Sequence, residues 1–391
     1  MAGETTERPR EGSGEPGAVR RATVYDVARA AEVSIATVSF AFRRPDSVKP
    51  STRERVLAAA RALGYAPSGA ARGLAAGRTG VFGLHSFDLI LDHAQALAGE
   101  FDDPVPELDL DALAADGPIS FDALGEAAWP DPRAYPLYVD EVQRGFELES
   151  RRLGREVLLS RGSSSATAVA DTAGRVDGLA VFPTRDAPET LRTISRTMPV
   201  VLLSAAPSED DHHRVLVDNM GGMQTLIAHL IDDHGIRDLG FVGSIEPSDA
   251  AERFRGMGLA MAERGLTPPE APIDSSTLAE RDSLARVAEL AAQRRLPRAL
   301  VCTNDQLALV TMEVLRGAGL DVPTDVAVTG FDGVLAGRLS TPTLTTVRQP
   351  MESMGRIAAR ILADEYAAPS KGPRRYRLGT RLEIRASCGC A

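Results

Sequence analysis

The stretch from Thr23 to Gly77 decides how this chain begins to fold, and it reads TVYDVARAAEVSIATVSFAFRRPDSVKPSTRERVLAAARALGYAPSGAARGLAAG. Apolar residues recur in it with helical spacing, first from Thr23, then from Ile35 to Phe42, and again from Ser51 to Leu63. Only a brief turn separates the first two helices. Two short helices joined in this way form a helix-turn-helix, whose second helix enters the major groove of DNA.

Capping residues predict where the first two helices begin. Thr23 and Asp26 have the spacing of a capping box, with aspartate in place of the more usual glutamate. Ser34 directly precedes the second helix and is a favourable N-cap. The spacing places one group of side chains at the base edges and two serines near phosphates: Ile35, Ala36, Thr37 and Phe40, with Ser34 and Ser39.

The charge distribution separates DNA binding from the alternative that these helices merely pack a core. From Val19 to Gly80 there are eleven Arg or Lys against four Asp or Glu, which gives +7. From Asp88 to Ala134 there are twelve acids against one base, which gives −11, within a chain of net charge −10. A basic head on an acidic body is expected of a protein in which only the head approaches phosphates.

The segment after the third helix predicts a marginal hinge. Ser68 can cap a helix of about two turns, but Gly69 and Gly73 lie inside it, and so short a helix is not stable alone. Leu74 is then either an ordinary linker residue or an apolar wedge that opens a base step in the minor groove.

Length and composition predict a multidomain chain without a membrane span. A chain of 391 residues exceeds one typical core, and no apolar run is long enough to cross a bilayer. The first eighteen residues lack an apolar signal region, so residues 1–20 are expected to be a disordered leader and the protein to be cytoplasmic. The three cysteines form no disulfide framework, and Cys388-Gly389-Cys390 reads as a reduced tail because two thiols are too few for a closed zinc site.

From Gly80 onward, short apolar strands alternate with helices. Runs such as Val81–Leu84, Leu239–Val242 and Ala299–Cys302 have the length and composition of buried strands. Such alternation predicts parallel sheets with helices on both faces, and the length allows two sheets.

The chain shows no catalytic pattern. His229 and His234 are five residues apart, which suits neither a zinc-binding HExxH helix nor a facial triad. There is no GxSxG, Walker A or GxGxxG motif, and Gly221-Gly222 lacks the flanks of a phosphate loop. We therefore expect no enzyme, no catalytic residue, no metal and no cofactor.

The head resembles the LacI/GalR family of bacterial transcription regulators. The resemblance rests on Thr23-Val24-Tyr25-Asp26-Val27-Ala28, Val33-Ser34, Ala36-Thr37-Val38-Ser39, Leu63-Gly64-Tyr65 and Ala71-Arg72-Gly73-Leu74. It implies backbone contacts from Thr23, Tyr25, Ser34 and Ser39, base contacts from the second helix, and a minor-groove wedge at Leu74. Arg43, Ala71 and Arg72 complete the DNA-binding residues that it implies.

Two positions depart from the family pattern. Glu32 stands where the family usually has glycine in the turn, which costs about 1 kcal/mol if the backbone there is left-handed. Phe40 stands where an arginine often reads a base. Phenylalanine covers a thymine methyl but makes no bidentate contact to guanine, so the operator sequence does not carry over from relatives.

The body resembles the family's effector domain, which is similar to periplasmic sugar-binding proteins. The matching motifs are Asp218-Asn219, Asn304-Asp305, Gly330-Phe331-Asp332 and Pro342-Thr343-Leu344-Thr345-Thr346-Val347, with Arg253. The resemblance implies two lobes joined by three crossings near Ala206, Gly330 and Val347. It also implies effector contacts from Arg253, Asn304 and Asp332, with Asp305 and Tyr138 nearby. The alternative for Asn304-Asp305 is a helix start that would be favourable without any ligand.

The expected organisation follows from both resemblances: head 21–66, hinge 67–79 and body 80–391. Lobe 1 spans about 80–206 and 331–346, and lobe 2 about 207–330 and 347–391. An acidic insertion at 88–134 separates the first strand from Tyr138, and it is either a solvent loop, a lid over the pocket or a segment inside it.

These features together predict a homodimeric, ligand-responsive DNA-binding regulator, most simply a repressor of a pseudo-palindromic operator whose effector is a sugar. Two alternatives are a solute-binding protein and a sugar-processing α/β enzyme. Activation instead of repression would depend on where the operator lies.

Overall fold

The computed structural model describes residues 22–43, 45–65, 78–87, 137–162, 166–182, 188–205, 210–245, 248–275 and 284–390. The chain divides into two compact units, Met1–Thr79 and Gly80–Ala391, so the second unit starts where the body was predicted to start. The leader 1–20, most of the hinge and the insertion 88–134 lie outside the described residues.

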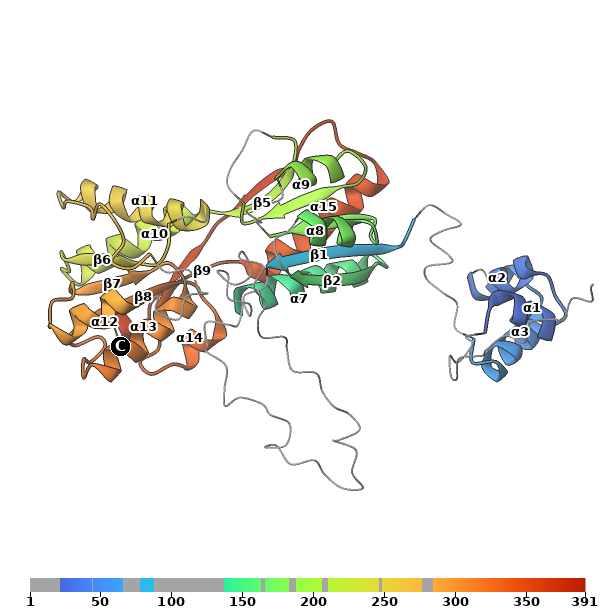
Figure 1. Cartoon of the computed structure of the whole chain (residues 1–391), viewed down its shortest axis with the longest axis horizontal. Helices are drawn as coiled ribbons and strands as arrows, with labels where there is room; N and C mark the ends of the chain where they lie inside the picture. The colour runs from blue at the N-terminus through green and yellow to red at the C-terminus, as the bar shows by residue number, and fades with distance from the viewer. Residues whose placement is uncertain are drawn as a thin grey trace, which may run out of the picture. The chain divides into compact units, whose positions relative to one another are not determined.

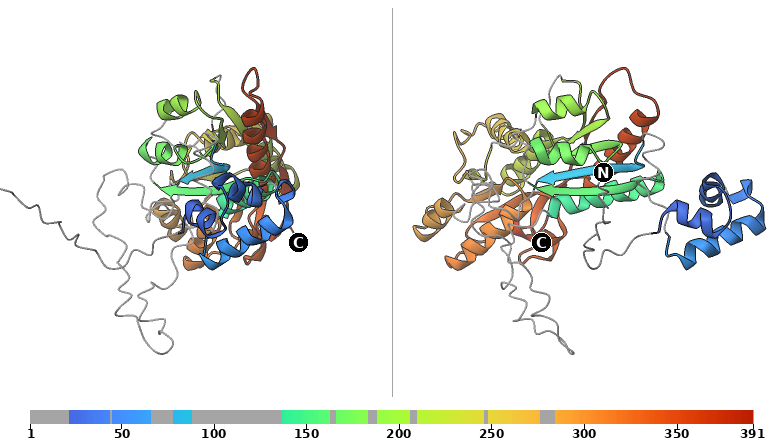
Figure 2. Two further views of the ribbon diagram at one scale, coloured as in Figure 1. Left: turned by 90° about the vertical axis from the view of Figure 1, so that its right-hand side faces the viewer. Right: turned by 45° about the vertical axis from the view of Figure 1, so that its right-hand side comes forward.

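The head consists of three helices and a 3₁₀ turn: α1 (Val24–Ala30), α2 (Ile35–Arg43), η1 (Pro45–Ser47) and α3 (Pro50–Ala62), drawn in blue in Figures 1 and 2. Its core is built from small side chains. Val27, Val38 and Val56 are at most 1% exposed, and alanines fill the space around them. These helices confirm the predicted helix-turn-helix.

The first lobe is a six-stranded parallel sheet with the order β10-β5-β4-β3-β1-β2. Its strands are β1 (Val81–Phe87), β2 (Glu156–Gly162), β3 (Gly178–Val181), β4 (Val200–Leu203), β5 (His213–Val217) and β10 (Arg375–Leu378). Helices α7 (Leu137–Arg152) and α15 (Met351–Ala367) cover one face, while α8 (Ala166–Ala173) and α9 (Pro188–Ile194) lie on the other (Figure 1). Strands β3 and β4 are buried along their whole length, because the sheet is covered on both sides.

Close packing of α7 on α15 depends on two glycines. A Cβ atom at Gly145 would overlap the backbone of Glu352, and one at Gly355 would overlap the backbone of Val142. The two helices therefore touch backbone to backbone, although they come from opposite ends of the body sequence.

The second lobe is a five-stranded sheet with the order β11-β9-β8-β7-β6, parallel except for β11. Its strands are β6 (Leu239–Val242), β7 (Ala299–Cys302), β8 (Ala327–Asp332), β9 (Thr345–Arg348) and β11 (Arg381–Glu383). One face packs against α10 (Asn219–Ala228), the π-helical turn η4 (His229–Asp233) and α11 (Ser248–Glu263), and the other against α12 (Ala285–Ala292) and α13 (Asp305–Gly317) (Figure 1). The short elements α14 (Leu335–Leu339) and η5 (Ala386–Cys388) complete this lobe.

Two of the three crossings between the lobes lie at positions other than those predicted. Strand β5 pairs with β4 in the first lobe, so the first crossing follows Val217 and does not lie near Ala206. Strands β8 and β9 both belong to the second sheet, so residues 331–346 are not part of lobe 1. The second crossing lies between β9 and α15, next to the predicted position at Val347, and the third lies between β10 and β11. Alternation of strands and helices gives the same sequence signal in both lobes, which is why it did not locate the crossings.

The fold class predicted from the sequence is confirmed: a helical head and two parallel sheets flanked by helices. Within the described residues, no helix is both long and apolar enough to span a bilayer.

Candidate DNA interface and effector site

The caps predicted for the head are present. The Asp26 carboxylate accepts a hydrogen bond from the Thr23 backbone N at 2.9 Å, and the Thr23 hydroxyl accepts one from the Asp26 backbone N at 3.4 Å. The Ser34 hydroxyl accepts a hydrogen bond from the Thr37 backbone N at 3.1 Å. These bonds fix the N-termini of α1 and α2, and hence the position of every side chain on α2.

Large apolar side chains are exposed on this small head. Tyr25 is 62% exposed, Ile35 41% and Phe40 46%, and Ala36 is exposed beside them. A head with so small a core would be expected to bury such side chains if they served only its own packing. They are therefore available to another molecule.

The remaining predicted DNA-binding residues fall into two groups. Thr37 and Ser39 are half-buried on α2, and the Thr37 hydroxyl lies 2.9 Å from that of Ser34. Arg43 is the last residue of α2 and is described only as backbone, whereas Ala71, Arg72 and Leu74 lie outside the described residues.

The turn between α1 and α2 has a left-handed backbone at Glu32, the position where the family usually has glycine. Glu32 adopts φ of +52°, and its side chain is exposed. A side chain in this conformation is strained, whereas glycine is not.

The body gathers polar side chains at the carboxyl ends of its strands, around Arg253 of α11. Arg253 is 6% exposed. Its Nε donates to Asn219 Oδ1 at 2.9 Å, and its Nη1 donates to the Thr303 carbonyl at 2.6 Å. The guanidinium also lies over the Phe331 ring, with Cζ 3.9 Å from the ring centroid. The arginine fork is therefore held rigidly by three neighbours.

Asp332, at the end of β8, is the carboxyl partner of this arginine. Its Oδ1 lies 3.7 Å from Arg253 Nη1 and accepts a hydrogen bond from Gln349 Nε2 at 2.6 Å. Burial raises the pKa of Asp332 to about 8, although the neighbouring arginine acts to lower it. Its backbone has φ of +126°, a region that residues other than glycine rarely occupy and that is typical of binding sites.

The first lobe contributes Tyr138 and Ser204. The two hydroxyl oxygens are 2.5 Å apart, and the Tyr138 ring packs edge-on against Phe182. Burial raises the pKa of the Tyr138 hydroxyl, which keeps it protonated. Asp249 of α11 hydrogen-bonds to Ser204 and Asn219, and burial raises the pKa of Asp249 to about 6. Polar groups of both lobes therefore meet here.

This arrangement is suited to binding and not to a covalent reaction. A fixed guanidinium, two carboxyl groups with raised pKa, a protonated phenol and two amides offer both donors and acceptors to a hydroxyl-rich molecule. Among the described residues of this cluster, Thr303 Oγ1 and Gln349 Oε1 are buried without a hydrogen-bond partner. Such groups are usually satisfied by water or by a ligand.

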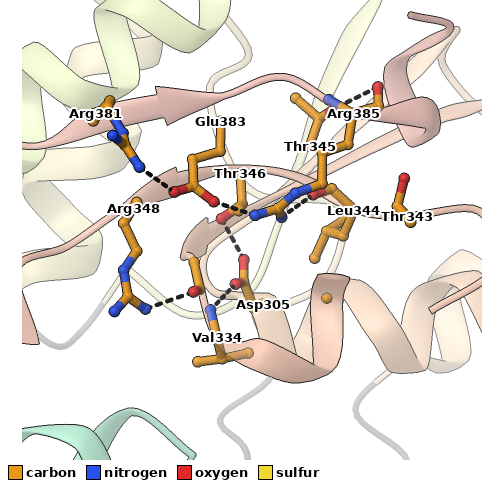
Figure 3. Close-up of polar contacts among 12 residues, drawn as sticks. Asp305, Val334, Thr343, Leu344, Thr345, Thr346, Arg348, Arg381, Glu383 and Arg385 are labelled. Carbon is orange, nitrogen blue, oxygen red and sulfur yellow. Dashed lines mark hydrogen bonds and ion pairs between the residues drawn. The ribbon is translucent and has the colours of Figure 1, made fainter. Parts of the chain in front are cut away.

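Asn304 and Asp305 support the fold. Asn304 caps α13, because its Oδ1 accepts a hydrogen bond from the Leu307 backbone N at 2.9 Å. Asp305 is fully buried, and both its oxygens are occupied: one accepts from Thr346 Oγ1 at 2.5 Å and the other from Val334 N at 2.8 Å (Figure 3). The structure therefore brings Tyr138, Arg253 and Asp332 together and gives Asp305 a different role.

Several residues of the cluster were not predicted from the sequence. They share a position just after a buried strand or at the first turn of a helix: Ser204, Asn219, Asp249, Thr303 and Gln349. Ligands of parallel α/β sheets bind outside the carboxyl ends of the strands, so polar residues directly after buried strands were the available signal.

An ion pair bridges the lobes beside this cluster. Arg348 of β9 donates to both carboxylate oxygens of Glu141 in α7, at 3.0 and 2.5 Å, and also to the Gly333 carbonyl at 2.6 Å. The two charged side chains are 29% and 30% exposed, so solvent screens the pair and its contribution is at most about 1 kcal/mol.

One further group in the described part of the chain has the composition of a metal site. It consists of His229, His234, Cys388 and Cys390, whose ligand atoms all lie within 4.8 Å of one another. The sequence interpretation treated the two pairs separately and expected no metal, whereas the fold brings them together.

Comparison with known proteins assigns both parts of the chain. Residues 23–68 match the model of bacterial regulatory proteins of the lacI family, and residues 227–388 match that of the periplasmic binding protein-like domain. Catabolite control protein A of Priestia megaterium is 26% identical over 378 residues, covering 93% of this chain and 98% of the relative. The transcriptional repressor PurR of Escherichia fergusonii is 27% identical over 370 residues, covering 94% and 96%.

Solved structures agree with these relatives. A complex of the transcriptional regulator CelR with cellobiose covers 94% of this chain and 100% of its own, at 25% identity and a TM-score of 0.60. The lac repressor dimer bound to operator and the anti-inducer ONPF covers 94% of this chain and 99% of its own. Its TM-score is 0.67 at 20% identity, which shows a shared fold.

Proposed function

Because the chain belongs to the LacI family of bacterial regulatory proteins and is a ligand-responsive DNA-binding transcription regulator, we propose that it is a dimeric repressor whose effector is a carbohydrate. The observation that carries the effector proposal is the buried cluster around Arg253 and Asp332. Because the protein would act on bacterial DNA, we also propose that it works in the cytoplasm.

The head supports a base readout that is mainly apolar. Ile35, Ala36 and Phe40 are exposed on α2, and such side chains contact thymine methyl groups in the major groove. Thr23 and Tyr25 lie at the start of α1, where contacts to the DNA backbone fix the register. By resemblance to the family, Leu74 of each protomer would enter the minor groove at the centre of the operator.

The effector proposal rests on the kind of hydrogen-bonding groups present. Arg253 offers hydrogen-bond donors in a fixed plane. The Asp332 carboxyl, with a pKa of about 8, is able to donate or to accept a hydrogen bond near neutral pH. Neighbouring hydroxyls of a sugar need this mixture of donors and acceptors. The structural relative solved with cellobiose supports the same class of ligand.

The ligand would act by changing how the lobes meet. Tyr138 and Ser204 come from the first lobe, whereas Arg253 and Asp332 come from the second. A molecule bound to both groups favours one arrangement of the lobes over another, and the hinges that join the body to the heads transmit that preference.

A gel-retardation experiment tests the DNA proposal. The full chain should retard a fragment carrying its own upstream region, and the affinity should fall as salt rises, because phosphate contacts release counterions. No salt-sensitive retardation, with or without candidate effectors, would disprove operator binding.

A thermal-shift screen of sugars, purines and related metabolites tests the effector proposal, since a ligand of the folded body raises its melting temperature. Asp332→Ala should keep DNA binding and lose the response to the ligand found. Glu313→Gln is the matched control, because Glu313 is 60% exposed on α13 and pairs only with Arg316 among the described ion pairs. An unchanged response in Asp332→Ala would reject the site. Conversion of the sugar would instead favour an enzyme.

A further inference from the structure

The cluster in the second lobe joins two segments that are far apart in the sequence. His229 and His234 lie at the π-helical turn η4, and Cys388 and Cys390 lie at η5. His229 Nε2 is 3.5 Å from Cys388 Sγ and 3.7 Å from Cys390 Sγ. His234 Nε2 is 3.3 Å from Cys390 Sγ and 3.2 Å from His229 Nε2.

These four separations are close to the edges of a tetrahedron around one zinc ion, and all ligand atoms of the cluster lie within 4.8 Å of one another. Zinc binds imidazole nitrogen at about 2.0–2.1 Å and thiolate sulfur at about 2.3 Å. The edge of a tetrahedron is about 1.6 times its radius, which gives ~3.3 Å between two nitrogens and ~3.5 Å between nitrogen and sulfur for these bond lengths. The nitrogen pair at 3.2 Å and the nitrogen–sulfur pairs at 3.3–3.7 Å fit these values.

The protonation of His229 also suits a metal. The Asp233 carboxylate lies 2.7 Å from His229 Nδ1, so Nδ1 carries a proton and donates it. His229 Nε2 then carries the free lone pair, and it lies 3.2–3.7 Å from His234 Nε2 and the two sulfurs. A carboxylate behind a ligating histidine is the usual way in which proteins fix the tautomer of zinc ligands.

Local backbone geometry brings each pair of ligands to one point. In an α-helix, residues five apart lie about 140° from each other around the axis. A π-helical turn instead brings residues i and i+5 to the same side of the axis, so His229 and His234 lie next to each other. The centroids of their imidazole rings are 4.8 Å apart, and the rings are nearly perpendicular. Gly389 has φ of +105°, which turns the chain so that both cysteines face the histidines.

We propose that these four residues, His229, His234, Cys388 and Cys390, form a structural Cys₂His₂ zinc site. Two thiolates and two imidazoles in tetrahedral arrangement select zinc, and four protein ligands leave no open position for catalysis. The ion ties η5 to the end of α10. The neighbouring Ser387 already holds η5 against β8, donating to the Val328 carbonyl at 2.5 Å.

Zinc analysis of the purified full chain tests the proposal. Metal determination by mass spectrometry should find one zinc per chain. Cys390→Ser and His234→Asn should lose it, and both positions are only half-buried, so these variants should fold. The control is Cys302→Ala, since Cys302 is a buried cysteine of the opposite face of the sheet and should leave the zinc in place. Asp233→Asn should lower zinc affinity about 10–100-fold.

Cobalt provides a measurement that does not depend on folding of the variants. The parent chain loaded with Co²⁺ should show the absorption of four-coordinate cobalt with thiolate ligands, and zinc should displace it. The proposal is overturned by any of three results: no stoichiometric zinc together with no such cobalt spectrum, zinc retained in Cys390→Ser, or a Cys388–Cys390 disulfide in protein purified under reducing conditions.

Discussion

Replacing Glu32 by glycine should stabilise the head. Glu32 occupies the turn between α1 and α2 with φ of +52°, where a Cβ atom crowds the following carbonyl oxygen. Its side chain is exposed. The substitution therefore relieves backbone strain without removing a buried contact.

The expected gain follows from two opposing effects. The left-handed conformation costs a non-glycine residue about 1–2 kcal/mol, and glycine loses about 0.5–1 kcal/mol more conformational entropy on folding. The net stabilisation is about 0.5–1 kcal/mol. For a head of about 45 residues, with an unfolding entropy of ~0.1 kcal/mol per kelvin, the melting temperature should rise by about 5–10 °C.

Hydrogen exchange of the full chain, followed by mass spectrometry on peptides from α1 and α2, reports the stability of the head separately from the body. Glu32→Gln is the matched control, because it removes the charge and keeps the Cβ atom. Glu32→Gln should leave the exchange of the head unchanged. Because both variants remove the same negative charge from the basic head, both should strengthen operator binding by a similar small factor. The reasoning is refuted if Glu32→Gly does not slow exchange, or if Glu32→Gln slows it equally.

Three further predictions concern caps and buried carboxyls. Ser34→Ala should destabilise the head by about 1 kcal/mol in the same exchange experiment, through loss of the cap on α2. Asp305→Ala should lower the free energy of unfolding of the body by about 2–4 kcal/mol, measured by urea denaturation, because Val334 N and Thr346 Oγ1 lose their acceptor. Since the pKa of Asp332 is raised to about 8, the folded body holds a proton that the unfolded chain releases near pH 4, so stability should fall between about pH 4 and pH 8. Asp332→Asn should flatten this fall in thermal melts recorded against pH, and an equally steep profile in the variant would contradict the assignment.

The head could be predicted from the sequence almost completely, because its determinants are local. The Thr23–Asp26 box, the Ser34 cap and the strained turn at Glu32 each depend on residues within a few positions of one another. Such interactions leave a direct trace in the order of residues.

For the body, the sequence predicts the fold class but not which strand belongs to which sheet. Strand β5 was assigned to the second lobe because a buried strand has the same composition in either sheet. Which sheet it joins depends on pairing between distant segments. The same limit explains the cluster at His229: the spacing of five was judged by α-helical geometry, and nothing near Cys388 indicates that it meets a π-turn more than 150 residues earlier.

The interleaving of the two lobes has a consequence for synthesis on the ribosome. The head is complete once Tyr65 has been made, but the first lobe lacks its edge strand until Leu378, which is 378 − 65 = 313 residues later. At about 5–20 residues per second, that interval lasts roughly 15–60 s. During this time a nascent chain carries a folded, basic DNA-binding head whose regulatory body is still unfinished.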